Sequence, residues 1–236
     1  MATKYIIEVL SIDEAIKVAK EYAKDKFTPE MEAVLKAALY DKDRVPSLKI
    51  RSTGTISLSE YIKKWVDSYL GGFYKRPSLK VANPSGTVPD SLMPSLLSAI
   101  FQNESEEDIK KMIAGHTFLM PLENLVGDLL EEYLSNKLGA AGWYCAWGST
   151  IDAVDFCHLD GRLLQIKNSD NSENSSSSRV RKDTPILKWF RRYSTKEDTF
   201  NWEELKNLTK VDNISEEDFR EWAVAAIKAN PKCIHF

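Results

Sequence analysis

The spacing of apolar residues predicts three helices near the start of the chain. Apolar side chains recur there every three or four positions, which places them on one face of a helix. The first helix begins at Ser11, where Glu14 three residues later completes the pattern of a capping box. The second begins at Pro29, and the third begins at Ser57 and closes at the pair Gly71-Gly72. These segments indicate a helical N-terminal part.

A change of composition marks the end of this part. From Arg76 to Pro94 the chain is rich in Pro, Ser, Gly and Asn, which is typical of a loop. We therefore divide the chain into a helical N-terminal part, residues 1–80, and a core with C-terminal helices, residues 81–236. Helical spacing resumes in SLLSAIFQ, in SEEDIKKMIAG and, as a separate helix, from Pro121 to Leu138, with Gly139 as its stop.

The following segment has the character of strands. Residues 142–169 are rich in aromatic and β-branched side chains, and Asp160-Gly161 is a turn signal between two apolar runs. A β-hairpin is predicted, with one strand around Asp155 and the other from Leu163 to Lys167. A polar loop follows, and helical spacing returns around 199–208 and 215–230, the latter capped by Ser215. The predicted fold is α/β, a central mixed sheet with flanking helices.

Composition limits the possible compartments. Hydrophobic residues make up 43% and charged residues 28% of the 236 positions, as in ordinary soluble proteins. No segment approaches the roughly 18 uninterrupted apolar residues of a membrane span, and the N-terminus lacks the features of a signal peptide. Three cysteines without a CxxC pair argue against a disulfide framework and a cysteine zinc site. We expect a cytoplasmic protein without a membrane association.

Positive charge is concentrated in one segment. The net charge is −3, but Arg179 to Arg192 holds six basic residues against Asp183 alone. Such a run can neutralise DNA phosphates, and the Asn- and Ser-rich loop before it offers further hydrogen bonds. The predicted DNA contacts are Asn168, Ser169, Asn171, Asn174, Ser176, Arg179, Arg181, Lys182, Lys188, Arg191 and Arg192. The alternative is a solvated basic face.

The hairpin gathers groups suited to phosphodiester hydrolysis. Strand side chains alternate, so Gln165 and Lys167 share a face, and the tight turn can bring Asp155 to them. A carboxylate and an amide oxygen can bind Mg²⁺, which prefers hard oxygen ligands. A nearby lysine can orient the attacking water or stabilise charge on the phosphate. The structural alternative for Asp155 is to cap a turn or to pair with an arginine.

The helix from Pro121 supplies the fourth candidate. Glu123 lies at the border of its apolar arc, whereas Asp128, Glu131 and Glu132 are expected nearer solvent. Gly127, one turn on, is expected to allow a close approach. The predicted catalytic residues are Glu123, Asp155, Gln165 and Lys167, and the predicted metal ligands are Asp155, Gln165 and Glu123. Glu123 also suits a first helical turn for purely electrostatic reasons.

Some chemically capable side chains are given lesser roles. Asp152 and His158 are weaker candidates for the metal site. Trp143, Trp147 and Trp189 are predicted to be core or interface residues, and the cysteines to be small buried hydrophobes.

Together these residues resemble the PD-(D/E)XK nuclease superfamily, in particular type II restriction endonucleases. That pattern is a helix bearing Glu, then a hairpin bearing Asp and an acid-x-Lys triplet. Here Val154 stands in place of the proline and Gln165 in place of the acid, which leaves the number of bound metal ions open. The strings ENLVGDLLEEYL, GWYCAWG and VDFCHLDGRLLQIKNS look specifically like the SinI group.

The resemblance implies a Mg²⁺-dependent, site-specific deoxyribonuclease that cuts double-stranded DNA at GGWCC-type sites. Cutting both strands of a near-palindromic site favours a homodimer, with a monomer that nicks sequentially as the alternative. Two other functions stay open. One is a structure-specific or repair nuclease with the same site, and the other is a DNA-binding protein with a degenerate nuclease fold.

Overall fold

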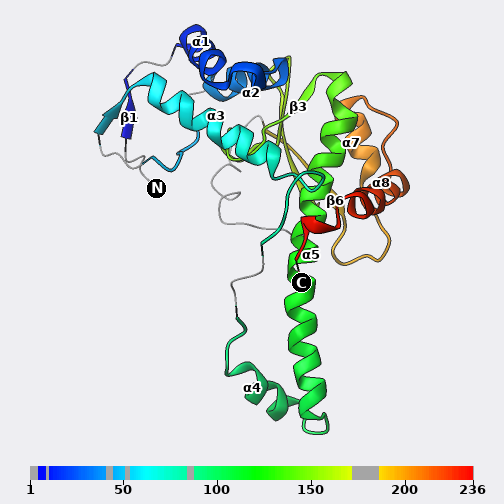
Figure 1. The fold of residues 1–236 in the computed structure, drawn as a ribbon. Helices are drawn as coiled ribbons and strands as arrows, with labels where there is room; N and C mark the ends of the chain where they lie inside the picture. The colour runs from blue at the N-terminus through cyan, green and yellow to red at the C-terminus, as the bar shows by residue number, and fades with distance from the viewer. Residues whose placement is uncertain are drawn as a thin grey trace.

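We describe a computed structural model of the chain, covering residues 5–8, 11–40, 45–50, 54–83, 88–171 and 186–235. Helices surround a four-stranded sheet, and one long helix extends well beyond the rest of the molecule (Figure 1). The predicted α/β fold with a central mixed sheet and flanking helices is confirmed.

The three predicted N-terminal helices are present as α1 (Ile12–Ala23), α2 (Pro29–Tyr40) and α3 (Leu58–Tyr74). The Ser11 and Ser57 side chains cap α1 and α3 by accepting hydrogen bonds from the backbone N–H groups of Glu14 and Glu60. A short 3₁₀ turn, Lys24–Lys26, follows α1. Two short strands, β1 (Tyr5–Ile7) and β2 (Gly54–Ile56), pair in parallel beside these helices.

The expectation that the glycine pair ends the third helix is wrong. Helix α3 continues through Gly71 and Gly72 to Tyr74. Gly72 is needed for packing, because a Cβ there would lie 2.2 Å from the backbone nitrogen of Gly148. Gly148 in turn has a φ of +70°, and a Cβ on it would lie 2.4 Å from the carbonyl oxygen of Ser68. The two glycines let α3 lie directly against the loop after the first strand of the central sheet.

The central sheet has the order β3-β4-β5-β6. Strands β3 (Trp143–Cys145), β4 (Phe156–His158) and β5 (Leu163–Ser169) are antiparallel neighbours, and β6 (Ile186–Arg192) runs parallel to β5. The predicted hairpin joins β4 to β5, with Gly161 at a φ of +94° in its turn. Such a φ favours glycine because it has no Cβ to clash with the backbone.

The two helices predicted on either side of residue 120 are one helix. Helix α5 runs from Glu106 to Leu138 with Pro121 inside it, and the shorter α4 (Met93–Ile100) precedes it. Pro121 removes one backbone hydrogen bond, yet the chain stays helical on both sides. The helix ends before Gly139 as predicted, although a 3₁₀ turn (Gly139–Ala141) follows and the left-handed residue is Gly142.

Helices α7 (Trp202–Thr209) and α8 (Glu216–Ala229) complete the chain, followed by a short turn, Pro231–Cys233. Ser215 caps α8 by accepting a hydrogen bond from the Asp218 N–H, as predicted. One hydrophobic core joins α1, α2, α3, α5, the sheet and the C-terminal helices. Trp143, Trp147 and Trp189 are buried in it, which confirms their prediction as core residues.

The three cysteines are buried and free, as predicted. Among the described residues, no helix combines the length and the apolar character that crossing a membrane requires. The predicted division into residues 1–80 and 81–236 stays a prediction.

Candidate active site

Asp155 is fixed by the backbone of the neighbouring strand. It directly precedes β4, and the register that pairs Phe156 with Leu164 places it opposite Gln165. Its N–H donates to the Leu164 carbonyl at 3.0 Å, and its Oδ2 accepts a hydrogen bond of 2.7 Å from the Ile166 N–H. The carboxylate is therefore held at the hairpin by a charge-assisted hydrogen bond.

Gln165 and Lys167 lie on the face expected from strand alternation. They are partly buried, whereas Leu164 and Ile166, which point the other way, are buried. In the parallel pairing of β5 with β6, Gln165 lies beside Lys188 and Lys167 beside Phe190. The Lys167 ammonium lowers the pKa of Asp155, so these two side chains lie close enough to interact. Asp155, Gln165 and Lys167 form one polar group on the sheet.

Helix α5 brings Glu131 to this group. Burial, together with the negative charges of Asp155 and Asp128, raises the pKa of Glu131 to about 8, against the lowering effect of Lys167. Burial also raises the pKa of Asp155 to about 6, against the lowering effects of the Ile166 N–H and Lys167. Two partly buried carboxylates and one ammonium therefore share a site where helix meets hairpin.

The structure places Glu123 elsewhere. Its side chain is exposed, and it precedes Glu131 by eight residues, which is about 12 Å along the helix axis and about 80° around it. The described geometry brings Glu131 rather than Glu123 to Asp155 and Lys167, and a catalytic role for Glu123 stays a prediction. Gly127 provides no close approach either, since nothing lies within 4 Å of the Cβ position there.

The expectation that Glu131 and Glu132 lie toward solvent was also wrong. Glu131 is partly buried and Glu132 is 3% exposed. Leu134 and Leu138, three and seven residues after Glu131, are fully buried. They continue the apolar stripe past Glu131, and this was the signal in the sequence that could have identified it.

The carboxylate of Glu132 interacts with residues outside the candidate site. Its carboxylate accepts hydrogen bonds from the N–H and the hydroxyl of Ser78 and pairs with Arg76 Nε at 3.2 Å. Lys80 pairs with Asp128 on the same helix at 2.7 Å. These contacts hold the segment 76–80 against α5, next to Glu131.

Glu131 also lines a cavity of about 420 Å³ between the end of α3 and α5. Its walls include Trp147, Gly148 and Asp128, together with three cationic residues, Lys75, Arg76 and Lys80. Lys75 is exposed and has no carboxylate partner within the described ranges. An anionic ligand that reached Glu131 and Asp155 would meet positive charge on this side.

The donors of the site suit a hard divalent cation. Mg²⁺ in proteins is often held by one or two carboxylates, with water and substrate oxygens completing its shell. Asp155 and Glu131 supply two carboxylates whose mutual repulsion a cation would relieve, and Gln165 adds an amide oxygen on the same face. Across the described parts of the chain, no three acidic, histidine or cysteine side chains form a metal-binding group. A divalent cation held here would therefore have two carboxylates, Asp155 and Glu131, rather than three acidic, histidine or cysteine ligands.

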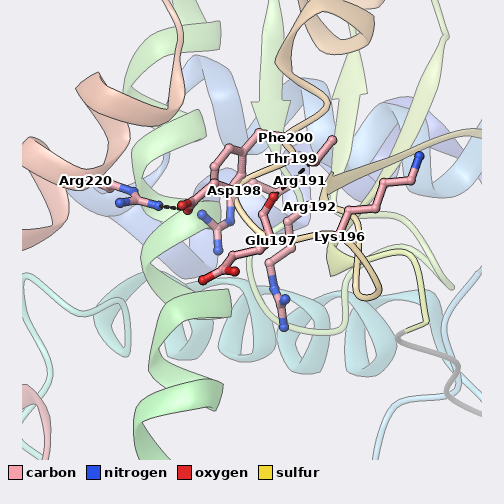
Figure 2. A pocket seen from close by; sticks show the side chains of 8 residues that line it. All are labelled: Arg191, Arg192, Lys196, Glu197, Asp198, Thr199, Phe200 and Arg220. Carbon is pink, nitrogen blue, oxygen red and sulfur yellow. Dashed lines mark hydrogen bonds and ion pairs between the residues drawn. The ribbon is translucent and has the colours of Figure 1, made fainter.

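Basic residues line a second cavity, of about 280 Å³, at the end of β6 (Figure 2). Arg192 and Lys196 line it, and no carboxylate among the described residues pairs with them. Arg220 also lines it but is paired with Asp198 at 3.5 Å and with Glu216 at 2.7 Å. Figure 2 shows the Arg192 side chain extending away from the Arg220–Asp198 pair.

Several residues predicted to contact DNA are engaged within the protein. Arg191 is 8% exposed, and its guanidinium donates to Glu216 at 2.7 and 2.8 Å and to Asn168 Oδ1 at 2.9 Å. Ser169 is buried and donates to Asp170 and Asn171. Lys188 and Arg192 are exposed and remain available. Asn174, Ser176, Arg179, Arg181 and Lys182 lie outside the described residues.

The weaker metal candidates have other surroundings. His158 Nε2 hydrogen-bonds with the Ala141 carbonyl at 2.9 Å, and Nδ1 lies 2.7 Å from Asp160 in the hairpin turn. Asp152 is exposed. Cys145 is buried beneath the site, where burial and the charges of Glu131 and Asp155 raise its thiol pKa.

Comparison with known proteins gives a family match over most of the chain. The family model described as SinI restriction endonuclease matches residues 60–228. The type II restriction enzyme Eco47I of Escherichia coli is 37% identical over 218 residues, which cover 87% of this chain and 92% of that enzyme. The type II restriction enzyme SinI of Salmonella infantis is 33% identical over 226 residues, covering 93% and 97%.

Proposed function

Because the chain belongs to the SinI family of type II restriction endonucleases, we propose that it hydrolyses double-stranded DNA with Mg²⁺ at the site built from Asp155, Glu131, Gln165 and Lys167. The observation that carries the proposal is the convergence of Asp155, Glu131 and Lys167 from the hairpin and α5. We replace Glu123 by Glu131 as the acidic residue of the helix.

Each residue has a distinct task. Asp155, held by the Ile166 N–H at 2.7 Å, and Glu131 would be the carboxylate ligands of Mg²⁺, with Gln165 as an amide ligand. The bound ion would polarise the phosphate and acidify a water molecule. Lys167 holds its ammonium beside the carboxylates, where it can orient a water molecule or stabilise negative charge on the phosphate. The water oxygen would form a new bond to phosphorus while one ester P–O bond breaks, and the water would lose a proton while the leaving ester oxygen gains one.

The DNA-binding surface would include exposed basic residues that have no carboxylate partner among the described residues. Lys188 and Arg192 on β6 and Lys75 at the cavity beside Glu131 are exposed basic residues near the site. The basic residues of the predicted segment outside the described ranges, Arg179, Arg181 and Lys182, belong to the same proposal. We further propose a GGWCC-type target, by the resemblance to the SinI group, and a homodimer that cuts both strands.

Plasmid digestion tests this function. Purified protein with Mg²⁺ should convert plasmid DNA into discrete fragments whose ends map to one short sequence, and EDTA should abolish cutting. The variant Asp155→Ala should lose at least about 10³-fold in rate while it still binds DNA. Smeared products or cutting only at junctions would favour a structure-specific nuclease. Binding without any cutting would favour a degenerate nuclease fold.

A further inference from the structure

A helical arm projects from the body of the protein. We define the arm as residues 92–120, which comprise α4 and the first half of α5 (Figure 1). Within the described chain, α4 packs substantially only against α5. A short helix that packs mainly on one neighbour gains little tertiary support, and helices depend on such packing for most of their stability.

The outer surface of the arm is apolar. More than half of the large apolar side chains exposed in the described chain belong to it. On α4, Met93, Leu96 and Ile100 follow helical spacing and are 37%, 49% and 69% exposed. On α5, Met112 and Leu119 are seven residues apart, one face of the helix, and are also exposed. Both helices therefore present an uncovered apolar stripe.

The charge of the arm argues against DNA or an anionic membrane as its partner. Residues 92–120 hold four carboxylates, Glu104, Glu106, Glu107 and Asp108, against two lysines. A surface with a net charge of −2 repels phosphates, whereas DNA-binding surfaces attract them with Lys and Arg. An apolar, slightly acidic surface is suited to another protein.

The exposed area matches what a dimer needs. Eight apolar side chains of the arm (Leu92, Met93, Leu96, Ile100, Phe101, Met112, Leu119 and Met120) together expose on the order of 800 Å² per chain, by their exposed fractions. Two such surfaces amount to about 1,600 Å², the size of a standard stable interface. Two arms related by a two-fold axis would form a four-helix bundle, in which each copy covers the stripe of the other.

We propose that the arm is the dimerisation element of this protein, and that its partner is the arm of a second copy. The need for two active sites rests on the proposed function, but the surface is assigned from its own exposure, area and charge. In this arrangement the arms hold two copies together, and each copy keeps its hairpin and Glu131 free for DNA.

Sedimentation of the full chain tests the proposal. The wild-type protein should sediment as a dimer of two 26.8 kDa chains. The variant Leu96→Glu/Ile100→Glu should be a monomer, with a dimer dissociation constant raised at least about 100-fold. The matched control is Val224→Glu on α8, which places the same charge at an apolar side chain that is 54% exposed outside the arm. This control should remain a dimer.

A second measurement guards against misfolding of the double variant. The native cysteines are buried, so a nitroxide attached at Ile100→Cys labels the arm selectively. The labels of two copies should lie within the roughly 50 Å that a bundle of 10–12 Å wide helices implies, and adding unlabelled protein should dilute the signal.

The outcomes test dimerisation through the arm separately from the proposed active site. A wild-type chain that stays monomeric at about 100 μM, with or without DNA, overturns it, as does a double variant that remains dimeric. If the arm variants are monomeric and convert plasmid mainly to nicked circles, both proposals stand. If the arm dimerises but Asp155→Ala still cuts DNA, only the proposed active site fails.

Discussion

The Asp155 carboxylate accepts a 2.7 Å hydrogen bond from the Ile166 N–H, a residue eleven positions later in the chain. The bond links the entry to β4 with the middle of β5. It fixes one carboxylate at the point where Lys167 and Glu131 also converge. The tasks of the four site residues follow from this arrangement and can be tested one by one.

Glu131 and Glu123 form a matched pair on one helix. Glu131→Gln should lower the cleavage rate at least about 100-fold, because it removes a carboxylate from the metal site. Glu123→Gln should change the rate less than about twofold, because that side chain is exposed and about 12 Å away along the axis. Single-turnover cleavage with saturating DNA measures both. The reverse pattern would restore Glu123 as the acid of the helix.

The same carboxylates predict a pH dependence. The pKa of Asp155 is raised to about 6 and that of Glu131 to about 8, so both bind protons below these values. Cleavage at limiting Mg²⁺ should rise between pH 6 and 8, because the ion competes with protons for the same oxygens. Saturating Mg²⁺ should shift the rise to lower pH. A profile that is flat across this range would contradict the prediction.

Stability should change with pH in the opposite direction. A carboxyl whose pKa is raised on folding disfavours the folded state once it ionises, so the free energy of unfolding should fall as pH rises from about 4.5 to about 8. At pH 8 without metal, Glu131→Gln should therefore stabilise the protein by on the order of 2 kcal/mol. Urea unfolding at pH 5 and pH 8 measures the difference, and equal effects at both values would contradict it.

The basic residues of β6 should contribute to DNA affinity and to its dependence on salt concentration. Lys188→Ala and Arg192→Ala should each weaken binding and reduce the slope of log K against log salt by about 0.9, the value for one phosphate contact. The control Lys17→Ala removes the same charge from an exposed position on α1 and should leave the slope unchanged. Fluorescence anisotropy with Ca²⁺ in place of Mg²⁺ follows binding without cutting.

Alanine should destabilise the protein at Gly72 but not at Gly71, because only Gly72 packs closely against Gly148. Gly72→Ala places a Cβ 2.2 Å from a backbone nitrogen, so the contact must open, at a cost of about 3 kcal/mol or more. Gly71→Ala meets nothing within 4 Å and should stabilise the helix by about 0.5 to 1 kcal/mol. Thermal unfolding of the two variants compares them directly, and equal shifts would refute a packing role for Gly72.

Local patterns along the chain were sufficient for most of the elements and for the hairpin. Spacing and capping residues located α1, α2 and α8, and the Asp160-Gly161 turn predicted that Asp155 lies close to Gln165 and Lys167, because these features depend on neighbours a few residues apart. The sequence predicted two helices where the structure has the single helix α5. A proline usually indicates a helix boundary, and nothing in the local pattern shows that the helix continues on both sides of it.

The sequence by itself determined the hairpin, the face shared by Gln165 and Lys167, and the resemblance to restriction endonucleases. Only the tertiary structure decided which glutamate of α5 meets them, because that choice depends on where a 33-residue helix crosses the sheet. It also decided that Arg191 is held by Glu216 within the protein and that the apolar stripes of the arm are uncovered. Helical spacing identifies an apolar face, but only packing shows which part of it has a partner.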